Sequence, residues 1–329
     1  MKRIINLIVA SALFAAVCSP AFAQPAGIIE DEKPMPVRIL YWNIQNGMWS
    51  DQGNNYDNFV AYVNSVNPDI CVWAEGKSHY KTGSTEKFES EDELYLTKHW
   101  PELAARYGHN YTYVGGDRDF YPQVITSRYP IENVKRITGT DSLLVVHGCG
   151  WATVDLNGRK FNFVTVHTWP QKYGFNIATE DRERSIAAHE GDYFRRTEME
   201  YICNETINGQ PDAANEYWVM LGDFNSRSRI DNYHYKWPDD DTRFLVHDYI
   251  REHTPYIDIV AEKYPGEFRK TIIGGTRIDF VYMTKPAFKC LKNVDIIYDG
   301  YPANTRAEGL SNFCYPSDHY PIIIDLGVN

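Results

Sequence analysis

Apolar and polar positions follow one another along the chain in a pattern that predicts a mixed α/β fold. The apolar runs at 37–43, 69–74 and 217–221 are short and end at polar residues, which is typical of buried strands. Between the first two runs, apolar residues recur at helical spacing over 56–66, and Asn67-Pro68 ends that helix. The pattern therefore indicates strands that alternate with helices.

The rest of the chain adds strands and two longer helices. The β-prone runs at 142–156 and 160–168 are joined by Asn157-Gly158, a strong signal for a hairpin turn. Helices are predicted over 91–106 and 177–207. Further strands are expected at 111–115, 122–127, 277–283, 293–298 and 320–326. Strands linked both by helices and by hairpins indicate mixed sheets with helices outside them, in a single α/β domain.

The first residues have the pattern of an export signal. Two basic residues precede an apolar stretch at 4–17 that is too short to span a bilayer well, and Ala21-Phe22-Ala23 is a small-x-small cleavage site. We expect residues 1–23 to be removed and residues 24–329 to form one catalytic domain, exported to the periplasm or secreted. No later apolar run has the length of a transmembrane helix, so none is expected.

Charge narrows the classes of partner. The sequence has 33 basic and 44 acidic residues, a net charge of −11, and removal of the two basic residues of the signal makes it −11 − 2 = −13. An acidic protein has no general electrostatic attraction to polyanions, which disfavours non-specific binding of nucleic acid. A small or lipid phosphoester remains open as a substrate, because a bound metal ion can supply local positive charge.

Cysteine usage argues against a structural zinc site. Five of the six cysteines follow residue 23, an odd number, and no CxxC pair occurs. Cys71 and Cys149 lie in apolar, strand-like runs and are expected in the core. A disulfide between Cys290 and Cys314 is one alternative in an oxidising compartment, and the sequence does not decide it.

Polar residues occur at the ends of the predicted strands, where sites on a rigid sheet commonly form. They are Asn43, Glu75, His167, Asp223, Asn225, Asp279, Asp318 and His319. Taken singly, each has an ordinary structural explanation, such as an Asx turn or a paired core histidine. Together they supply carboxylates, amides and two histidines. Hard oxygen ligands suit Mg²⁺, Mn²⁺ or Ca²⁺ better than Zn²⁺, and phosphoester hydrolysis needs such a cation together with a group that activates water.

Seven short stretches, in order along the chain, resemble the endonuclease/exonuclease/phosphatase (DNase I-like) superfamily. They are residues 40–44, 73–75, 127–131, 164–168, 222–225, 277–280 and 317–321. Gly-Asp-Phe-Asn and Ser-Asp-His are moderate signals alone, and the ordered set is a strong one. The resemblance implies a four-layer α/β/β/α sandwich of two mixed β-sheets packed face to face with helices outside. It also implies hydrolysis by in-line attack of water at phosphorus.

The resemblance implies roles around a metal ion and a water molecule. Glu75 is expected to be the main ligand of Mg²⁺ or Mn²⁺, with Ca²⁺ as an alternative, and Asn43 and Asp318 are expected to complete the shell. Asp223 and Asn225 are expected to position or deprotonate the attacking water.

The resemblance also assigns the two histidines. His319, oriented by Asp279, is similar to the family's other general-base or phosphate-contacting residue. His167 is expected to bind a phosphoryl oxygen or to assist the leaving group. Which residue is the base stays open at this point.

The chain departs from its relatives in ways that bear on the substrate. Where relatives often have Leu-Gln-Glu, it has Trp73-Ala74-Glu75, so any contact of the glutamine is lost. Trp169, with Trp42 and Trp49, is expected to form apolar walls around the leaving group, although a core position is an equal alternative for Trp42. Arg128 is a candidate contact to the substrate.

A small phosphoester is the predicted substrate, for a phosphodiesterase or a phosphatase. A nuclease would need a basic track, but Arg182, Arg184, Arg195 and Arg196 are interleaved with acidic residues. A sphingomyelinase-like enzyme would need an exposed apolar hairpin, and none is evident. A catalytically inactive ligand-binding module on the same fold is the alternative from another class.

Overall fold

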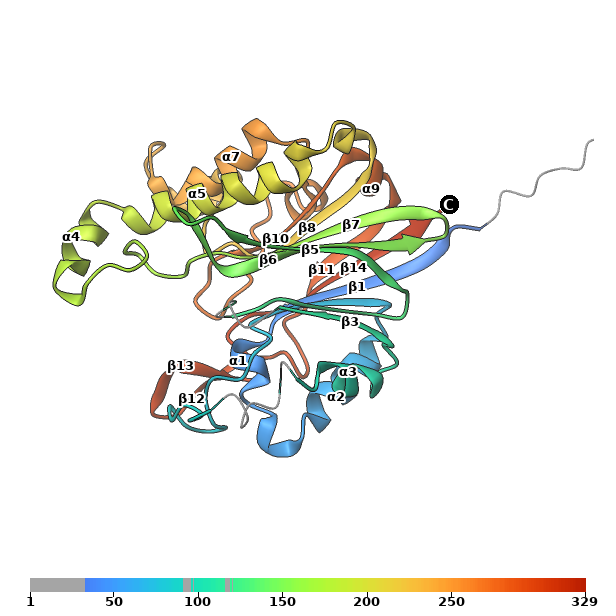
Figure 1. Cartoon of the computed structure of the whole chain (residues 1–329), viewed down its shortest axis with the longest axis horizontal. Coiled ribbons are helices and arrows are strands. Elements are labelled where there is room, and N and C mark those ends of the chain that lie inside the picture. Colours follow the sequence, from blue (N-terminus) through green and yellow to red (C-terminus); the bar gives the residue numbers. More distant parts are fainter. Residues whose placement is uncertain (1–32, 91–95, 97, 116–118, 120) are drawn as a thin grey trace, which may run out of the picture. The chain divides into compact units, whose positions relative to one another are not determined.

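Two six-stranded sheets form the centre of the computed structural model (Figure 1), which describes residues 33–90, 96, 98–115, 119 and 121–329. Residues 34–329 form one compact unit. The predicted export signal and most of residues 91–97, where the second helix was expected to begin, lie outside the described residues.

Both sheets are mixed, as predicted. In spatial order the first sheet consists of β11 (Leu291–Ile296), β14 (Ile322–Val328), β1 (Met35–Asn43), β2 (Ile70–Ala74), β4 (Val124–Ser127) and β3 (Tyr111–Val114). The second sheet consists of β5 (Ile131–Gly139), β6 (Leu144–Leu156), β7 (Arg159–His167), β8 (Tyr217–Asp223), β10 (Asp279–Met283) and β9 (Ile257–Asp258). A separate ladder pairs β12 (Thr305–Ala307) with β13 (Leu310–Tyr315).

Helices cover the outer faces of the sheets. The described helices are α1 (Gln45–Met48), α2 (Asp57–Val66), α3 (Trp100–Ala105), α4 (Arg182–Ala187), α5 (Glu190–Glu205), α6 (Asn232–Tyr235), α7 (Leu245–His253), α8 (Ile259–Lys263) and α9 (Lys285–Cys290). Figure 1 shows α5 and α7 over the second sheet, and α2 and α3 below the first sheet. No helix among these has the length and hydrophobicity that a bilayer crossing requires.

Alternating side chains of the strands build the layers, because successive residues of a strand point to opposite faces. Tyr41 of β1 joins the core between the sheets, whereas its neighbour Trp42 packs with Phe59 of α2. Phe163 of β7 faces the same central core, and Val164 faces the layer of α5 and α7. The result is the predicted α/β/β/α sandwich.

Strand direction brings the predicted polar residues to one edge of the sheets. β1 and β2 run parallel, and so do β7 and β8. His167 at the end of β7 pairs with Asp223 at the end of β8, and Asp223 pairs with Asp279 at the start of the antiparallel β10. Glu75 directly follows β2, whose last residue pairs with Asn43 of β1. The ends of five strands therefore present side chains to one region.

Two details of the helices and turns can be compared with the sequence. The hairpin is confirmed: Leu156 pairs with Arg159, and Asn157 and Gly158 have φ values of 56° and 77°, as a tight hairpin turn requires. The prediction of a single helix over 177–207 was wrong. This segment contains two helices, α4 and α5, because His189 between them adopts a left-handed conformation with φ 56°.

The alternative of a disulfide between Cys290 and Cys314 was also wrong. All five described cysteines, Cys71, Cys149, Cys203, Cys290 and Cys314, are free. Cys290 ends α9 and packs against the core between the sheets, whereas the backbone N–H of Cys314 in β13 donates to Gln45 at 2.9 Å. The two thiols belong to different parts of the fold.

Candidate active site

A buried chain of hydrogen bonds fixes His319. Its Nδ1 lies 2.8 Å from Oδ2 of Asp279, and the hydroxyl of Tyr41 donates to the other oxygen of Asp279 at 2.6 Å. Burial alone would lower the pKa of His319, but the charges of Asp279 and Asp318 raise this pKa well above its ordinary value. His319 is therefore an oriented cation at neutral pH, with its Nε2 atom directed toward Asp223.

Asp223 lies at the centre of the site. Its Oδ2 is 3.7 Å from Nε2 of His319 and 3.8 Å from Nε2 of His167, and it accepts a hydrogen bond from the side chain of Asn43 at 3.1 Å. Its Oδ1 accepts the backbone N–H of Asn225 at 2.9 Å. Burial and the negative charge of Asp279 raise the pKa of Asp223 to about 7. A carboxylate with such a pKa is suited to accept a proton at neutral pH.

Glu75 is held on the other side of Asn43. The amide of Asn43 donates to Oε1 of Glu75 at 3.3 Å, and the backbone N–H of Asn46 donates to Oε2 at 2.8 Å. Burial and the charge of Asp318 raise the pKa of Glu75. Glu75 has a φ of 57° and Asn225 has a φ of 45°. Left-handed backbone at a residue other than glycine costs on the order of 1 kcal/mol, and such residues concentrate at functional sites.

The donor set fits a hard divalent cation. Glu75, Asp223, Asp279 and Asp318 bring four carboxylates together, and histidines are the only basic side chains among the described residues that form ion pairs with them. Ligand atoms of Asp223, Asp279 and His319 lie within 4.8 Å of one another. Both oxygens of Asp279 already accept hydrogen bonds, however. Those two bonds are short, at 2.6 and 2.8 Å, whereas Oε1 of Glu75 has only the 3.3 Å contact with Asn43 among the described residues, and Asp318 lies 3.9 Å from Nε2 of His319. Glu75 and Asp318 are therefore the better candidate ligands.

His167 differs from His319 in charge. Its Nδ1 lies 3.3 Å from the carbonyl oxygen of Tyr121, and burial lowers its pKa to about 4. Because a carbonyl only accepts, Nδ1 carries the hydrogen, and Nε2 of the neutral ring is an acceptor. The ring of His147 stacks on His167 with 4.3 Å between the ring centroids. His147 lies within an ordinary β-prone run, so the sequence offered no signal for it.

Trp169 borders the site next to Asn225. The side-chain amide of Asn225 donates to the carbonyl oxygen of Thr168 at 3.0 Å. The backbone N–H of Thr168 donates in turn to the carbonyl oxygen of Asp223 at 3.1 Å. The half-buried indole of Trp169 packs against Phe175, at 5.2 Å between ring centroids. The structure thus keeps Trp169 beside the predicted water-positioning residues.

Three predicted contacts to the substrate are corrected. Arg128 forms an ion pair with Asp69 at 3.1 Å, and Asp69 precedes β2, at the end of that strand opposite Glu75. Trp42 and Trp49 are fully buried. Trp42 belongs to the core layer of α2, and Trp49 packs against Phe313 at 4.6 Å. Neither indole is an apolar wall of a cleft.

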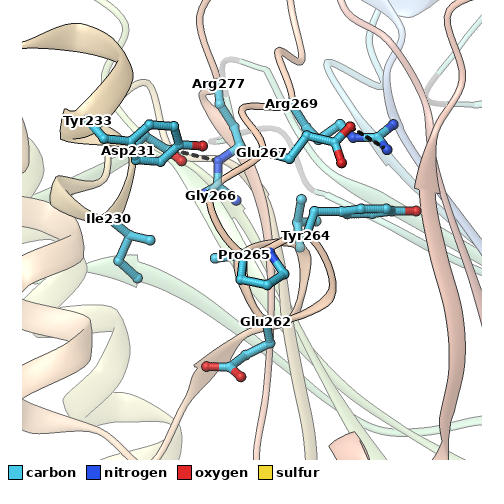
Figure 2. Close-up of a pocket in the computed structure, with 12 residues that line it drawn as sticks. Ile230, Asp231, Tyr233, Glu262, Tyr264, Pro265, Gly266, Glu267, Arg269 and Arg277 are labelled. Carbon is cyan, nitrogen blue, oxygen red and sulfur yellow. Dashed lines mark hydrogen bonds and ion pairs between the residues drawn. The ribbon is translucent and has the colours of Figure 1, made fainter.

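A cavity of about 220 Å³ lies elsewhere, beside Arg277 and between residues 230–233 and residues 260–269 (Figure 2). None of the predicted site residues lines it. The guanidinium of Arg277 is fully occupied by Asp231 and Asp258, with hydrogen bonds of 2.8 to 3.1 Å. The charges of Arg277, Asp231 and Asp258 therefore pair with one another, and these bonds stabilise the loop that precedes β10.

The comparison with protein families decides the assignment of the fold. The model of the Endonuclease/Exonuclease/phosphatase family matches residues 40–319. The chain belongs to this family. Members of this family generally hydrolyse phosphoester bonds. No curated protein sequence matches the chain.

Solved structures of the family share its fold at low sequence identity. An AP endonuclease from Archaeoglobus fulgidus is 16% identical, with a TM-score of 0.58, and the match covers 88% of this chain and 98% of that one. The human Nocturnin catalytic domain with bound sulfate is 15% identical, with a TM-score of 0.57 and coverage of 90% and 94%. The 3′ phosphatase NExo from Neisseria, bound to a product DNA hairpin, is 18% identical, with a TM-score of 0.54 and coverage of 88% and 99%.

Proposed function

We propose that this member of the family is an exported, divalent-metal-dependent hydrolase of small phosphoesters. One observation carries the proposal: Oδ2 of the buried Asp223 lies within 3.8 Å of Nε2 of two histidines, His319 and His167, and burial lowers the pKa of His167 while neighbouring carboxylates raise that of His319. A site that holds one acid and one base around a central carboxylate can move protons in both directions.

Each residue of the site has a distinct task in hydrolysis. Asp223 accepts the proton of the attacking water, because its pKa of about 7 allows it to be ionised and still basic. Asn225, fixed by its hydrogen bond to the carbonyl of Thr168, orients that water. His319 donates a hydrogen bond from Nε2 to a phosphoryl oxygen and stabilises the charge that develops there. His167 takes the proton of the water from Asp223 at Nε2, 3.8 Å away, and passes it to the leaving oxygen.

Glu75 and Asp318 would hold Mg²⁺ or Mn²⁺, which would supply positive charge for the phosphoryl oxygens. Burial raises the pKa of both carboxyls, and the charge of Asp318 adds to this at Glu75 while the charge of Asp279 adds to it at Asp318, so a bound cation would favour the ionised form of both. Asn43 contacts both Glu75 and Asp223 and so links the cation-binding side of the site to the proton-accepting side.

Hydrolysis of two model esters tests the proposal. The full chain is assayed with Mg²⁺ or Mn²⁺ on bis-p-nitrophenyl phosphate and on p-nitrophenyl phosphate, with EDTA as the metal-free control. Activity on the diester alone identifies a phosphodiesterase, and activity on the monoester identifies a phosphatase. No hydrolysis of either ester, together with tight binding of a phosphoester, would favour the inactive binding module and overturn the proposal.

The same assay with additional substrates distinguishes the substrate classes. Two structural neighbours are an AP endonuclease and a 3′ phosphatase bound to a DNA hairpin. The net charge of −11 argues against a general affinity for nucleic acid. We therefore expect turnover of small esters to exceed that of duplex DNA and of sphingomyelin vesicles. Faster hydrolysis of DNA or of sphingomyelin would replace the small-ester substrate with that polymer or lipid.

Export is the part of the proposal that rests on sequence alone. Residues 4–17 are apolar and Ala21-Phe22-Ala23 is a small-x-small site. When the full chain is expressed in a Gram-negative host, mass spectrometry of the periplasmic fraction is expected to give an N-terminus at Gln24. Recovery of the intact chain in the cytoplasm would contradict export.

A further inference from the structure

Three arginines gather on the side of the site that carries Asn225. They are Arg195 of α5, Arg227 in the loop after β8, and Arg243 before α7. Arg227 follows Asn225 by two residues, and its backbone N–H donates to the carbonyl of Arg243 at 3.1 Å. Its charge interacts with that of Asp223 and is opposed by those of Arg195 and Arg243. The three guanidiniums therefore share one neighbourhood next to the catalytic carboxylate.

Two of these arginines have their own partners. Arg195 is almost fully buried, forms an ion pair with Asp192, and donates to the carbonyl oxygens of Trp169 and Gln171 at 2.9 and 2.8 Å. Arg243 donates to both oxygens of Asp241 at 2.8 and 2.6 Å. Each of these guanidiniums is matched by one carboxylate.

Arg227 has no such partner. None of the described residues forms a hydrogen bond or an ion pair with its guanidinium, and its Nε atom is buried without an acceptor. Asp192 and Asp241 pair with the other two guanidiniums, and Asp223, the remaining carboxylate nearby, interacts with Arg227 without an ion pair. A partly buried cation without a partner costs free energy, because desolvation is not offset by an ion pair. Binding of an anion would offset this cost, and this gives Arg227 a function at its position.

We infer that Arg227 is a second anion subsite, which binds a phosphate group of the substrate other than the one that is hydrolysed. This inference rests on the proposed function, since it assigns a substrate with two phosphates to the same site. A guanidinium binds a phosphate through two parallel N–H groups, and this geometry suits a terminal phosphate monoester. Trp169 lies on the same side, because Arg195 bonds to its carbonyl, so the organic part of the substrate lies between the two phosphates against the indole.

Binding of inorganic phosphate to the metal-free protein tests the subsite without any turnover. Isothermal titration in EDTA compares the wild type with Arg227→Gln, and Arg251→Gln on α7 is the matched control with the same change of charge. We expect Arg227→Gln to weaken phosphate binding at least tenfold, Arg227→Lys to restore part of it, and Arg251→Gln to change it less than twofold. Equal affinity in Arg227→Gln and the wild type would overturn the subsite, whether or not the protein hydrolyses esters.

A pair of substrates tests whether the subsite serves catalysis. The p-nitrophenyl ester of thymidine 5′-phosphate is compared with the same ester carrying a 3′-phosphate. In the wild type the added phosphate is expected to lower KM at least tenfold with a similar kcat, and in Arg227→Gln it is expected to have no effect on KM. An unchanged preference in Arg227→Gln would overturn the assignment. Unfolding curves of the variants establish that they are folded.

Discussion

Nδ1 of His319 lies 2.8 Å from Oδ2 of Asp279, in a buried pair that joins one sheet to the other. Asp279 begins β10 of the second sheet, and His319 precedes β14 of the first. Tyr41 of β1 donates to the second oxygen of Asp279 across the same interface. The orientation of the imidazole therefore depends on the packing of the two sheets and is fixed before a substrate binds.

Removal of this pair should abolish most of the turnover. His319→Asn is expected to lower kcat/KM for bis-p-nitrophenyl phosphate by roughly 10² to 10⁴, the usual contribution of a positioned acid or base. Asp279→Asn should also lower kcat/KM, because a neutral amide no longer stabilises the protonated imidazole of His319. His253→Asn, at the end of α7, is the control and should leave kcat/KM unchanged. Full activity of His319→Asn would refute its role.

Glu75→Gln should weaken the binding of the metal. The amide can still accept the backbone N–H of Asn46, so the loop is expected to keep its structure, but the ligand loses its charge. We expect the Mg²⁺ concentration that gives half-maximal activity to rise at least tenfold, and titration with Mn²⁺ monitored by electron paramagnetic resonance to show the same loss. Glu132→Gln, an exposed position on β5, serves as the control. Unchanged affinity in Glu75→Gln would exclude Glu75 as a ligand.

Glu198 should make stability depend on pH. It is fully buried, accepts the backbone N–H groups of Val146 and Trp169 at 2.9 Å each, and burial raises its pKa to about 7 from 4.5. A raised pKa means that the folded state holds the proton more tightly. The stabilisation is complete below pH 4.5 and is lost as the pH rises through 7, an effect of about 3 kcal/mol.

Denaturant unfolding at pH 4.5, 6 and 8.5 measures this dependence. The free energy of unfolding of the wild type should fall relative to that of Glu198→Gln across this interval. Glu200→Gln, on the exposed side of the same helix, should follow the wild type at every pH. A constant difference between the wild type and Glu198→Gln would show that folding does not raise the pKa of Glu198.

His147→Phe should stabilise the protein. The ring is buried, stacks on His167, and neither of its nitrogens has a hydrogen-bond partner among the described residues. A phenyl ring keeps the stacking and removes two unpaired polar atoms, which should raise the free energy of unfolding by about 1 kcal/mol. The matched change His247→Phe should lower it by about 1 kcal/mol, because His247 bonds to the hydroxyl of Tyr282 at 2.8 Å. Equal effects of the two substitutions would contradict this account.

The sequence predicted which polar side chains lie together because polarity changes abruptly where each strand ends. Strand direction then brings Asn43, Glu75, Asp223 and His319 together, and the order of motifs was enough to predict this. Arg128 was assigned wrongly for the same reason. It follows β4, and β4 is antiparallel to β2, so its position is at the start of β2 and not at the end.

Other features leave no periodic signal in the sequence. β5 is an edge strand with mostly exposed side chains, so the predicted elements did not include it. The break at His189 depends on one left-handed residue, which amphipathic spacing does not reveal. Arg227 and His147 differ from ordinary residues only in lacking partners, and a missing partner is visible only in three dimensions.

The first strand of the described chain pairs on one side with the last. β1 lies between β2 and β14, and the indole of Trp42 donates to the carbonyl of His319, 277 positions away. During synthesis, Asn43 and Glu75 emerge from the ribosome long before Asp318 and His319 exist. The nascent polypeptide must therefore remain inert until its final segment is inserted beside β1, and a fragment that ends before this segment should be unable to process any ester.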